Sequence, residues 1–314
     1  MKLLTNLQNK MKQGIHLKHT KISWYALTRL ILFLILIVLV VTLACTSCVS
    51  NLHSKSLSKQ LAGLQVDLSD TQKELEKYSK ANLSEGFPYQ TKYPDLYVKD
   101  VQEKKDADQK VVYLTFDDGP SKYTTQTLDL LDRYNVKATF FVVNYDSDQS
   151  TQLYKDIVQR GHSLGIHTAT HEYKTIYASV DDYLEDFNTI YQHLKTVTGQ
   201  EPTLFRFPGG SINSYNTTIY RQLIAEMQRR GFTYHDWNVD SGDTKKNATP
   251  QSIHDNVVSA VMQNNKSVVL LHDSDTKGNT AQALESIIVD LQAAGYEFRA
   301  LDDTVKPFHF TDPE

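Results

Sequence analysis

The stretch VVYLTFDDGP, residues 111–120, places an apolar run directly before two adjacent carboxylates and a Gly-Pro turn. Further short apolar runs follow it, separated by segments of helical length. The predicted strands are 111–116, 137–143, 162–167, 203–207, 232–239, 266–271 and 297–301. The predicted helices are 122–134, 150–160, 179–197, 216–230, 250–264 and 278–294. Such regular alternation predicts an α/β fold with a parallel sheet, either closed or doubly wound.

Polar side chains recur where these predicted strands end. In a closed α/β barrel, reactive side chains gather at the carboxyl ends of the strands. The polar residues at those ends are Asp117, Asp118, His167, His171, Arg206, Asp240, His272 and Asp273. Histidine and aspartate are concentrated here, so this end of the sheet is the candidate site.

Asp117 and Asp118 are neighbours at the end of the first predicted strand. Adjacent side chains on an extended backbone point in different directions. One carboxylate can therefore bind a cation while the other stays free to accept a proton. Taken alone, Asp-Gly after a strand is more often simple turn chemistry.

His167 and His171 are four residues apart, which puts both imidazoles on one side if the segment turns helically. Two histidines and one carboxylate form an open zinc shell. Its remaining position would hold a water whose pKa the metal lowers to about 7. For an isolated H-x-x-x-H the alternative is that these rings only pack or form hydrogen bonds at a strand end.

Three further motifs follow in order, RFPGG (206–210), WNVD (237–240) and LLHD (270–273). Together the five motifs closely resemble the polysaccharide deacetylase family, carbohydrate esterase family four, over about residues 108–306. The resemblance implies a distorted (β/α) barrel with about seven parallel strands. It also implies a divalent metal, usually zinc, and an N-acetylated cell-wall glycan as substrate.

The same resemblance implies a role for each motif residue. The metal would be held by Asp118, His167 and His171. Asp117 would be the general base, with Arg206 paired to it and holding its pKa down. His272 would be the general acid, with its ring oriented by Asp240. The Gly209 N–H would stabilise the oxyanion, and Trp237 and Leu270 would line the acetyl-methyl pocket unless they are ordinary core residues.

Two positions depart from the family pattern. Family members often carry an aromatic residue at the place of Gly209, and a Trp where Thr244 follows Asp243. Sugar rings stack on aromatic walls. The groove is therefore expected to be less aromatic, which leaves the length and identity of the substrate open. Asp273 stays outside the catalytic set, as a supporting or a turn residue.

The N-terminal region predicts a membrane anchor. Residues 1–29 carry six basic and no acidic residues, and residues 30–49 carry no charge. A helix of this length spans roughly 30 Å, enough to cross a bilayer. The positive-inside rule puts the N-terminus in the cytoplasm and the rest outside the cell membrane. A cleaved signal peptide, or a lipoprotein signal ending at Cys45, are the alternatives to an uncleaved anchor.

Between the anchor and the catalytic region we expect a stalk at 50–80 and a linker at 81–107; a C-terminal tail covers 307–314. In the stalk, residues at heptad spacing run from Leu57 to Tyr78. Such a stalk is either a coiled coil with weak self-association or a single amphipathic helix. Cys45 and Cys48 fall near the end of the anchor, so the exported part has no disulfide.

Net charge bears on the class of partner. Six of the 33 basic residues lie in the first 29, which leaves 27 basic against 37 acidic groups. This balance argues against nucleic-acid binding and suits a neutral or cationic substrate. The sequence predicts an extracytoplasmic deacetylase of N-acetylglucosamine units in peptidoglycan or a wall-attached polysaccharide. The alternatives are an O-acetyl polysaccharide esterase and a non-catalytic glycan-binding scaffold.

Overall fold

The computed structural model describes residues 33–36, 87–106 and 110–310. The chain divides into two compact units, Met1–Gln90 and Thr91–Glu314. In the first, residues 33–36 are helical. The predicted stalk, and the rest of the predicted anchor, lie outside the described residues. Among the residues that are described, no helix is both long enough and apolar enough to cross a bilayer.

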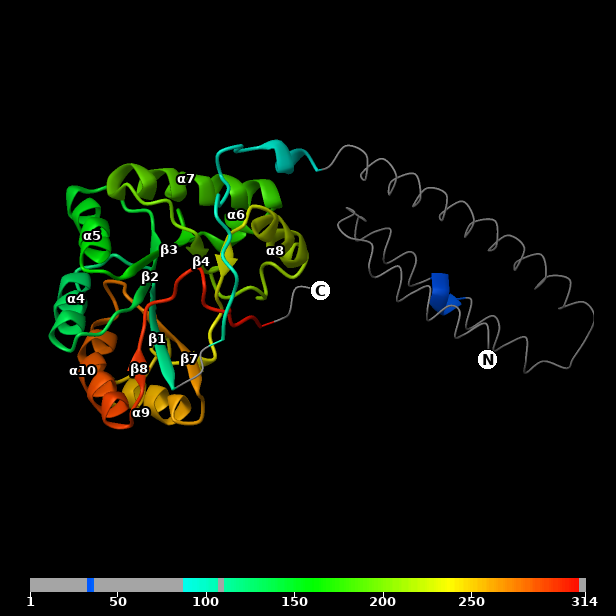
Figure 1. Cartoon of the computed structure of the whole chain (residues 1–314). Helices are drawn as coiled ribbons and strands as arrows, with labels where there is room; N and C mark the ends of the chain where they lie inside the picture. Colours follow the sequence, from blue (N-terminus) through cyan, green and yellow to red (C-terminus); the bar gives the residue numbers. More distant parts are fainter. Residues whose placement is uncertain (1–32, 37–86, 107–109, 311–314) are drawn as a thin grey trace, which may run out of the picture. The chain divides into compact units, whose positions relative to one another are not determined.

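A parallel sheet forms the centre of the second unit, as the sequence predicts. Its strands are β1 (Val111–Asp117), β2 (Thr139–Val143), β3 (Ser163–Thr168), β4 (Leu204–Phe205), β5 (Thr233–Tyr234), β6 (Val239–Asp240), β7 (Lys266–His272) and β8 (Glu297–Phe298). Seven of them follow the order β5-β4-β3-β2-β1-β7-β6, and β8 pairs with β1. The sheet curls into a half-barrel, with helices around its outside (Figure 1).

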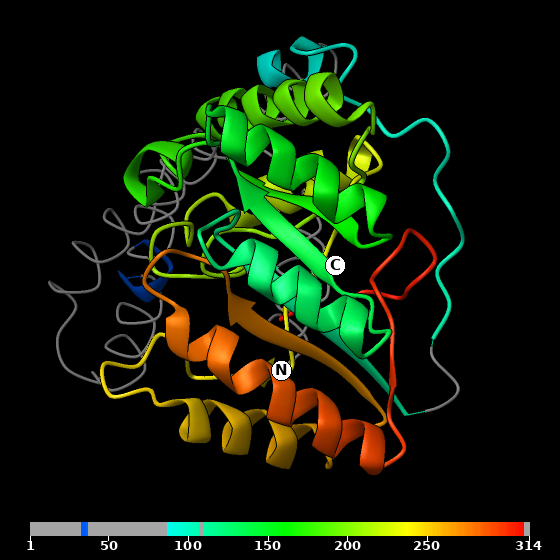
Figure 2. The same ribbon diagram turned by 90° about the vertical axis from the view of Figure 1, so that its left-hand side faces the viewer.

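The helices fall close to the predicted segments. They are η1 (Pro88–Thr91), a 3-10 helix, and the α-helices α4 (Thr124–Arg133), α5 (Asp148–Gln159), α6 (Tyr173–Ile176), α7 (Val180–Thr198), α8 (Tyr220–Arg229), α9 (Pro250–Val261) and α10 (Gly278–Ala293). Capping boxes start α5 at Ser147 and α9 at Thr249, so both helices begin with satisfied N–H groups. Figure 2 shows α4, α5 and α10 side by side over one face of the sheet. The short α6 was not predicted.

The central strands are buried along almost their whole length. Every residue of β1 is buried, and so are Ser267 to Leu271 of β7. Strands covered on both faces read as continuous apolar runs, which is why these two were visible in the sequence. The paired register sets Asp117 at the end of β1 opposite His272 at the end of β7.

The run 232–239, predicted as one strand, forms two short strands instead. Between β5 and β6 the backbone carbonyls turn toward a buried guanidinium. Arg206 Nε donates to the carbonyl of His235 at 2.8 Å, and Arg206 Nη2 to that of Asp236 at 3.1 Å. Because β5 and β6 are the two ends of the strand order, this side chain bridges the open side of the half-barrel.

Residues 92–96 of the predicted linker and His309 of the predicted tail pack on the barrel. Buried Arg230 donates to the carbonyls of Lys92, Tyr93 and Leu96 at 2.9, 3.1 and 3.3 Å. At the other end of the chain, the ring of His309 stacks on Tyr234 with centroids 3.9 Å apart. Both segments therefore belong to the folded unit.

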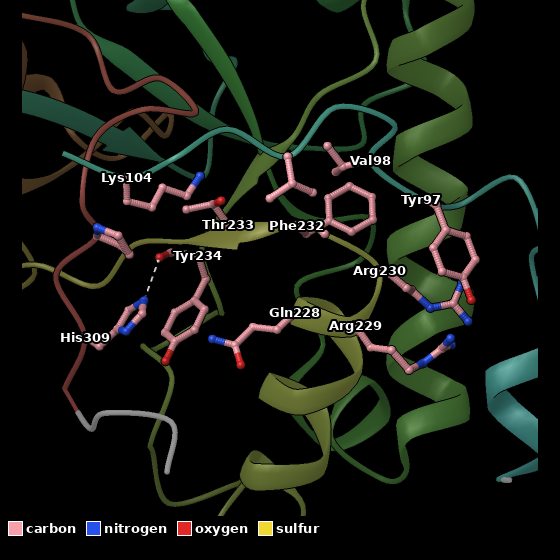
Figure 3. A pocket seen from close by; sticks show the side chains of 13 residues that line it. Tyr97, Val98, Lys104, Gln228, Arg229, Arg230, Phe232, Thr233, Tyr234 and His309 are labelled. Atoms are coloured by element: carbon pink, nitrogen blue, oxygen red, sulfur yellow. Dashed lines mark hydrogen bonds between the residues drawn. The ribbon is translucent and has the colours of Figure 1, made fainter.

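A cavity of about 380 Å³ lies where these segments meet the barrel (Figure 3). Its walls come from Tyr97 to Lys104, from the end of α8 and from β5. Arg229 and Arg230 in its wall are both paired with Glu226. None of the residues that line this cavity belongs to the predicted site. The cavity therefore lies where the 97–104 segment packs on the barrel, and not at the candidate active site.

Candidate active site

The three predicted metal ligands meet at the carboxyl end of the sheet. Asp118 follows β1, His167 lies in β3, and His171 stands in the loop after β3. Asp118 Oδ1 lies 3.5 Å from His167 Nε2 and 3.3 Å from His171 Nε2. One ligand atom from each residue falls within 4.8 Å of the other two. The structure thus brings together residues from two separate motifs.

The protonation of His167 is fixed by its surroundings. Its Nδ1 lies 2.8 Å from the carbonyl of Arg206, which can only accept a hydrogen bond. Nδ1 therefore carries the proton, and Nε2 turns its lone pair toward Asp118. Burial lowers the pKa of His167 to about 3, so the ring is neutral. A neutral imidazole with a directed lone pair is the form that binds metals.

The loop that carries His171 is held by a carboxylate from α7. Asp186 accepts hydrogen bonds from the N–H groups of Ala169 and Thr170 at 2.6 and 2.9 Å. It also accepts from the hydroxyls of Thr168 and, at 2.7 Å, Thr170. These contacts hold a backbone in which His171 has a φ of +57°. Asp186 is therefore a positioning residue for the second histidine.

Asp118 has the character of a cation ligand. Its backbone φ is +71°, an uncommon value for a residue other than glycine. Its Oδ1 is buried and accepts no hydrogen bond from the described residues. A buried, unpaired carboxylate oxygen is costly unless a cation compensates it. Together with two imidazole nitrogens, this oxygen gives a donor set that fits a divalent cation.

Asp117 is directed by Arg206, as predicted from the resemblance. Arg206 Nη1 donates to Asp117 Oδ1 at 2.9 Å and to the Thr115 hydroxyl at 2.6 Å. Both side chains of the ion pair are almost completely buried. The other carboxylate oxygen, Asp117 Oδ2, lies 3.9 Å from His167 Nε2 and so faces the ligand cluster.

Two opposing effects act on the pKa of Asp117. Burial raises the pKa of Asp117, and the positive charge of Arg206 opposes that rise without cancelling it. Arg206 thus lowers the pKa of Asp117 as expected, but the net pKa is raised. Removal of the carboxylate from water outweighs the neighbouring cation.

His272 is oriented by Asp243, not by Asp240. The ring Nδ1 of His272 donates to Asp243 Oδ1 at 2.8 Å, and the backbone N–H of His272 donates to Oδ2 at 2.8 Å. Thr280 also donates to Asp243 Oδ2, at 2.9 Å. Asp240 is exposed, and its Oδ1 accepts from the N–H of Gly242 at 2.8 Å. The assignment of Asp240 fails because its side chain caps its own turn.

The His272 imidazole favours its charged form. Burial lowers the pKa of His272, but the hydrogen bond and charge of Asp243 outweigh that effect and leave the pKa raised. The pKa of Asp243 is itself lowered: burial raises it, and His272 more than offsets this. The pair thus favours an imidazolium with a carboxylate behind it, which is the geometry of a proton donor.

The predicted substrate-contacting residues lie around this centre. Gly209 is exposed, with a φ of +73°, and its N–H donates no hydrogen bond within the described residues. The ring of Trp237 lies 5.7 Å from the Arg206 guanidinium and 4.7 Å from the ring of Phe310. Leu270 is buried in β7, beside Thr115 of β1.

Three residues at this site were not predicted from the sequence. Asp243 was named only as the residue before Thr244, although its place three residues after Asp240 made it the natural second choice. Asp186 sits in the middle of a helix and had no distinguishing signal. Tyr173 lies beside Gly209: a Cβ at Gly209 would be 3.0 Å from Tyr173 Cε1. The expectation of a less aromatic surface overlooked this ring.

Several known proteins are similar to this chain in sequence. A family model described as polysaccharide deacetylase matches residues 104–230. The putative polysaccharide deacetylase YheN of Bacillus subtilis is 35% identical over 226 residues, 69% of this chain and 76% of that protein. A Bacillus cereus protein named peptidoglycan-N-acetylglucosamine deacetylase is 34% identical over 209 residues, 64% of this chain and 91% of that protein.

Solved structures give a similar result. The catalytic domain of a peptidoglycan N-acetylglucosamine deacetylase from Eubacterium rectale superposes with a TM-score of 0.64 at 40% identity. The match covers 67% of this chain and 96% of that one. The polysaccharide deacetylase Bc1974 of Bacillus cereus gives a TM-score of 0.57 at 29% identity, over 64% of this chain and 97% of that one.

Proposed function

The chain belongs to the polysaccharide deacetylase family, and from that premise we propose that it removes N-acetyl groups from N-acetylglucosamine units of a cell-wall polymer. The products are acetate and a free amine on the sugar. One observation carries the proposal: a ligand cluster of Asp118, His167 and His171 lies beside the carboxylate of Asp117. The printed names of similar proteins, which include peptidoglycan deacetylases, support the choice of substrate.

We propose that the ligand cluster holds a zinc ion. Two imidazole nitrogens and one carboxylate oxygen are the ligand set of an open zinc site. Zinc bound there would supply Lewis acidity, polarising the acetyl carbonyl and making a bound water more acidic. His167 serves this purpose as a neutral ring, because its Nδ1–H is already committed to a backbone carbonyl.

Asp117 accepts the proton of the attacking water. Arg206 holds Oδ1 of this carboxylate by a 2.9 Å hydrogen bond, so the carboxylate cannot rotate freely. That leaves Oδ2 turned toward the ligand cluster, where the water attacks. The water oxygen forms a new bond to the acetyl carbon as its proton passes to Asp117.

His272 donates a proton to the departing amine. Its Nδ1–H is held by Asp243, so Nε2 is the nitrogen from which the proton leaves. When the carbon–nitrogen bond breaks, that proton joins the amine nitrogen, and the sugar leaves as a free amine. The exposed N–H of Gly209, without a partner in the described part of the chain, is suited to donate to the oxyanion.

The test separates the amide reaction from the ester alternative. Purified peptidoglycan and wall polysaccharide would each be incubated with the protein in the presence of zinc, and acetate and free glucosamine would be measured. We expect acetate and free amine in equal amounts, loss of both with chelator, and no turnover by Asp117→Asn. Acetate without new amine would identify an O-acetyl esterase, and no acetate from any fraction would leave only a glycan-binding scaffold.

We also propose that the uncharged segment 30–49 anchors the protein in the cell membrane, with the catalytic unit outside. The support is the charge pattern of residues 1–49. A tethered enzyme reaches only nearby polymer, which suits a wall substrate. Protease added to intact, wall-stripped cells should digest the catalytic unit and leave the N-terminal segment in the membrane fraction; full protection would contradict the orientation.

A further inference from the structure

Two tyrosines form a surface that leads outward from the ligand cluster. Tyr173 opens α6, two residues after His171, and its ring meets the imidazole edge-on at 5.1 Å and 88°. The ring of Tyr215 lies 5.0 Å from that of Tyr173, at an angle of 50°. Tyr173 is half-buried, whereas Tyr215 is 50% exposed. We call Tyr173 and Tyr215 the tyrosine platform.

The missing side chain of Gly209 makes room for the platform. A Cβ at Gly209 would lie 3.0 Å from Cε1 and 3.1 Å from the hydroxyl oxygen of Tyr173. A side chain at position 209 would therefore require the Tyr173 ring to shift, and the positive φ of Gly209 disfavours such a side chain in any case. With glycine at this position, the aromatic surface beside the site comes from α6.

Tyr177 and Asn213 hold the platform in place. Tyr177 packs against Tyr173 with ring centroids 6.0 Å apart, and its hydroxyl donates to the carbonyl of Pro208 at 2.7 Å. Asn213 donates to the same carbonyl at 3.0 Å and accepts from the N–H of Tyr215 at 2.8 Å. The platform is thus tied to the loop that carries Gly209.

The exposure of Tyr215 is not explained by core packing. A large aromatic ring kept half in water beside a site for a carbohydrate is suited to contact the substrate. The apolar C–H face of a pyranose ring can pack on an aromatic face, and burial of these two apolar faces contributes modest affinity. Tyr173 touches a metal ligand and Tyr215 lies one ring further out, so Tyr215 is placed for a neighbouring sugar unit.

We propose that the tyrosine platform binds the sugar unit next to the one that is deacetylated, and thereby selects oligomeric glycans over single sugars. This inference rests on the proposed function. The ring of Tyr215 packs against the apolar face of that neighbouring unit, and Tyr173 keeps Tyr215 at a fixed distance from the ligand cluster. The specificity of the enzyme for a polymer then resides partly in α6 and the loop of Tyr215.

The experiment uses the full-length zinc-loaded chain and chitotetraose, a tetramer of N-acetylglucosamine. We expect Tyr215→Ala to raise KM about threefold to tenfold, with a smaller effect on kcat, because stacking contributes on the order of a factor of ten. Tyr215→Phe keeps the ring and should restore the parental KM. Tyr134→Ala is the matched control, since Tyr134 follows the end of α4 at the opposite end of the barrel.

Direct binding separates failure of this inference from failure of the proposed function. The Kd for chitotetraose would be measured by calorimetry on the same variants. If the parent binds the tetramer but releases no acetate, the proposed function fails and the Kd values alone decide on the platform. Equal KM and Kd for parent and Tyr215→Ala would overturn the platform, as would a parent that does not bind the tetramer.

Discussion

His167 and His272 stand at the carboxyl ends of two strands of one sheet, yet their surroundings shift the pKa values of the two rings in opposite directions. Both are largely buried, which by itself favours the neutral form. The Nδ1–H of His167 meets only an uncharged backbone carbonyl, and burial lowers the pKa of His167 to about 3. The Nδ1–H of His272 meets the Asp243 carboxylate, and the pKa of His272 is raised. Burial therefore dominates at His167, whereas at His272 the carboxylate partner outweighs burial.

The largest effect is expected for the loss of His167, the neutral ring. His167→Ala removes one of three ligands, so bound zinc and acetate release should both fall to background. Zinc content after gel filtration and acetate release would be measured together. His254→Ala, on the outer helix α9, is the control and should retain both. A His167→Ala variant that keeps stoichiometric zinc would remove this ring from the ligand set.

Loss of the charged ring should separate binding from chemistry. His272→Gln leaves the ligand cluster intact, so zinc content should be unchanged. Acetate release should fall by roughly 10²–10⁴-fold, the usual contribution of a proton donor. Parental turnover would show that another group protonates the amine.

The pKa difference between the two histidines can be reduced by replacing the partner of His272 instead of the ring. In Asp243→Asn the His272 ring loses its carboxylate partner, so its raised pKa should drop. The imidazolium is present only below this pKa, so activity falls as pH rises through it. The descending limb of the pH–rate profile should therefore move to lower pH in Asp243→Asn, and at pH values above the limb of both proteins the activity should be about tenfold lower for each unit of the move.

Asp240→Asn provides the matched comparison for that profile. Asp240 is exposed and binds only the N–H of its own turn, so the limb should stay in place. A shift in Asp240→Asn but not in Asp243→Asn would reverse the assignment made from the structure.

The smallest effect is expected for the loop that carries His171, which Asp186 holds in place. Asp186→Asn replaces one acceptor oxygen by a donor among the four hydrogen bonds that shape the loop before His171. Zinc affinity should weaken about tenfold, at the low end for residues that support ligands. Glu185→Gln, exposed on the same helix, should leave the affinity unchanged, as measured by competition with a chelating dye. Equal affinities for the two variants would contradict the role of Asp186.

The predictability of the fold varied with the length of each strand. β1 and β7 are long and buried, so their apolar runs were distinct in the sequence. The run 232–239 was misjudged as one strand because its composition suits a strand throughout. Its middle breaks because the carbonyls of His235 and Asp236 bind Arg206, a residue of another motif. No local pattern contains that information.

The site was predictable to the extent that motifs carried it. The residues of the ligand cluster were named from two motifs and a resemblance, and the structure brings them together. The partner of His272 was misassigned because Asp240 and Asp243 are close in sequence, and only the turn at Gly242 decides between them. Gly242 has a φ of +69°, a conformation that the sequence alone does not reveal.

Arg206 has a consequence for how activity could be lost in descendants of this chain. Its guanidinium binds the carboxylate of Asp117 and also the segment between the two terminal strands. A substitution there leaves Asp117 buried without its counter-charge, which typically costs 3–5 kcal/mol. We expect related proteins that lose enzymatic activity to change His171 or His272 first, because these rings reach solvent. We expect them to keep Arg206, because the fold depends on it.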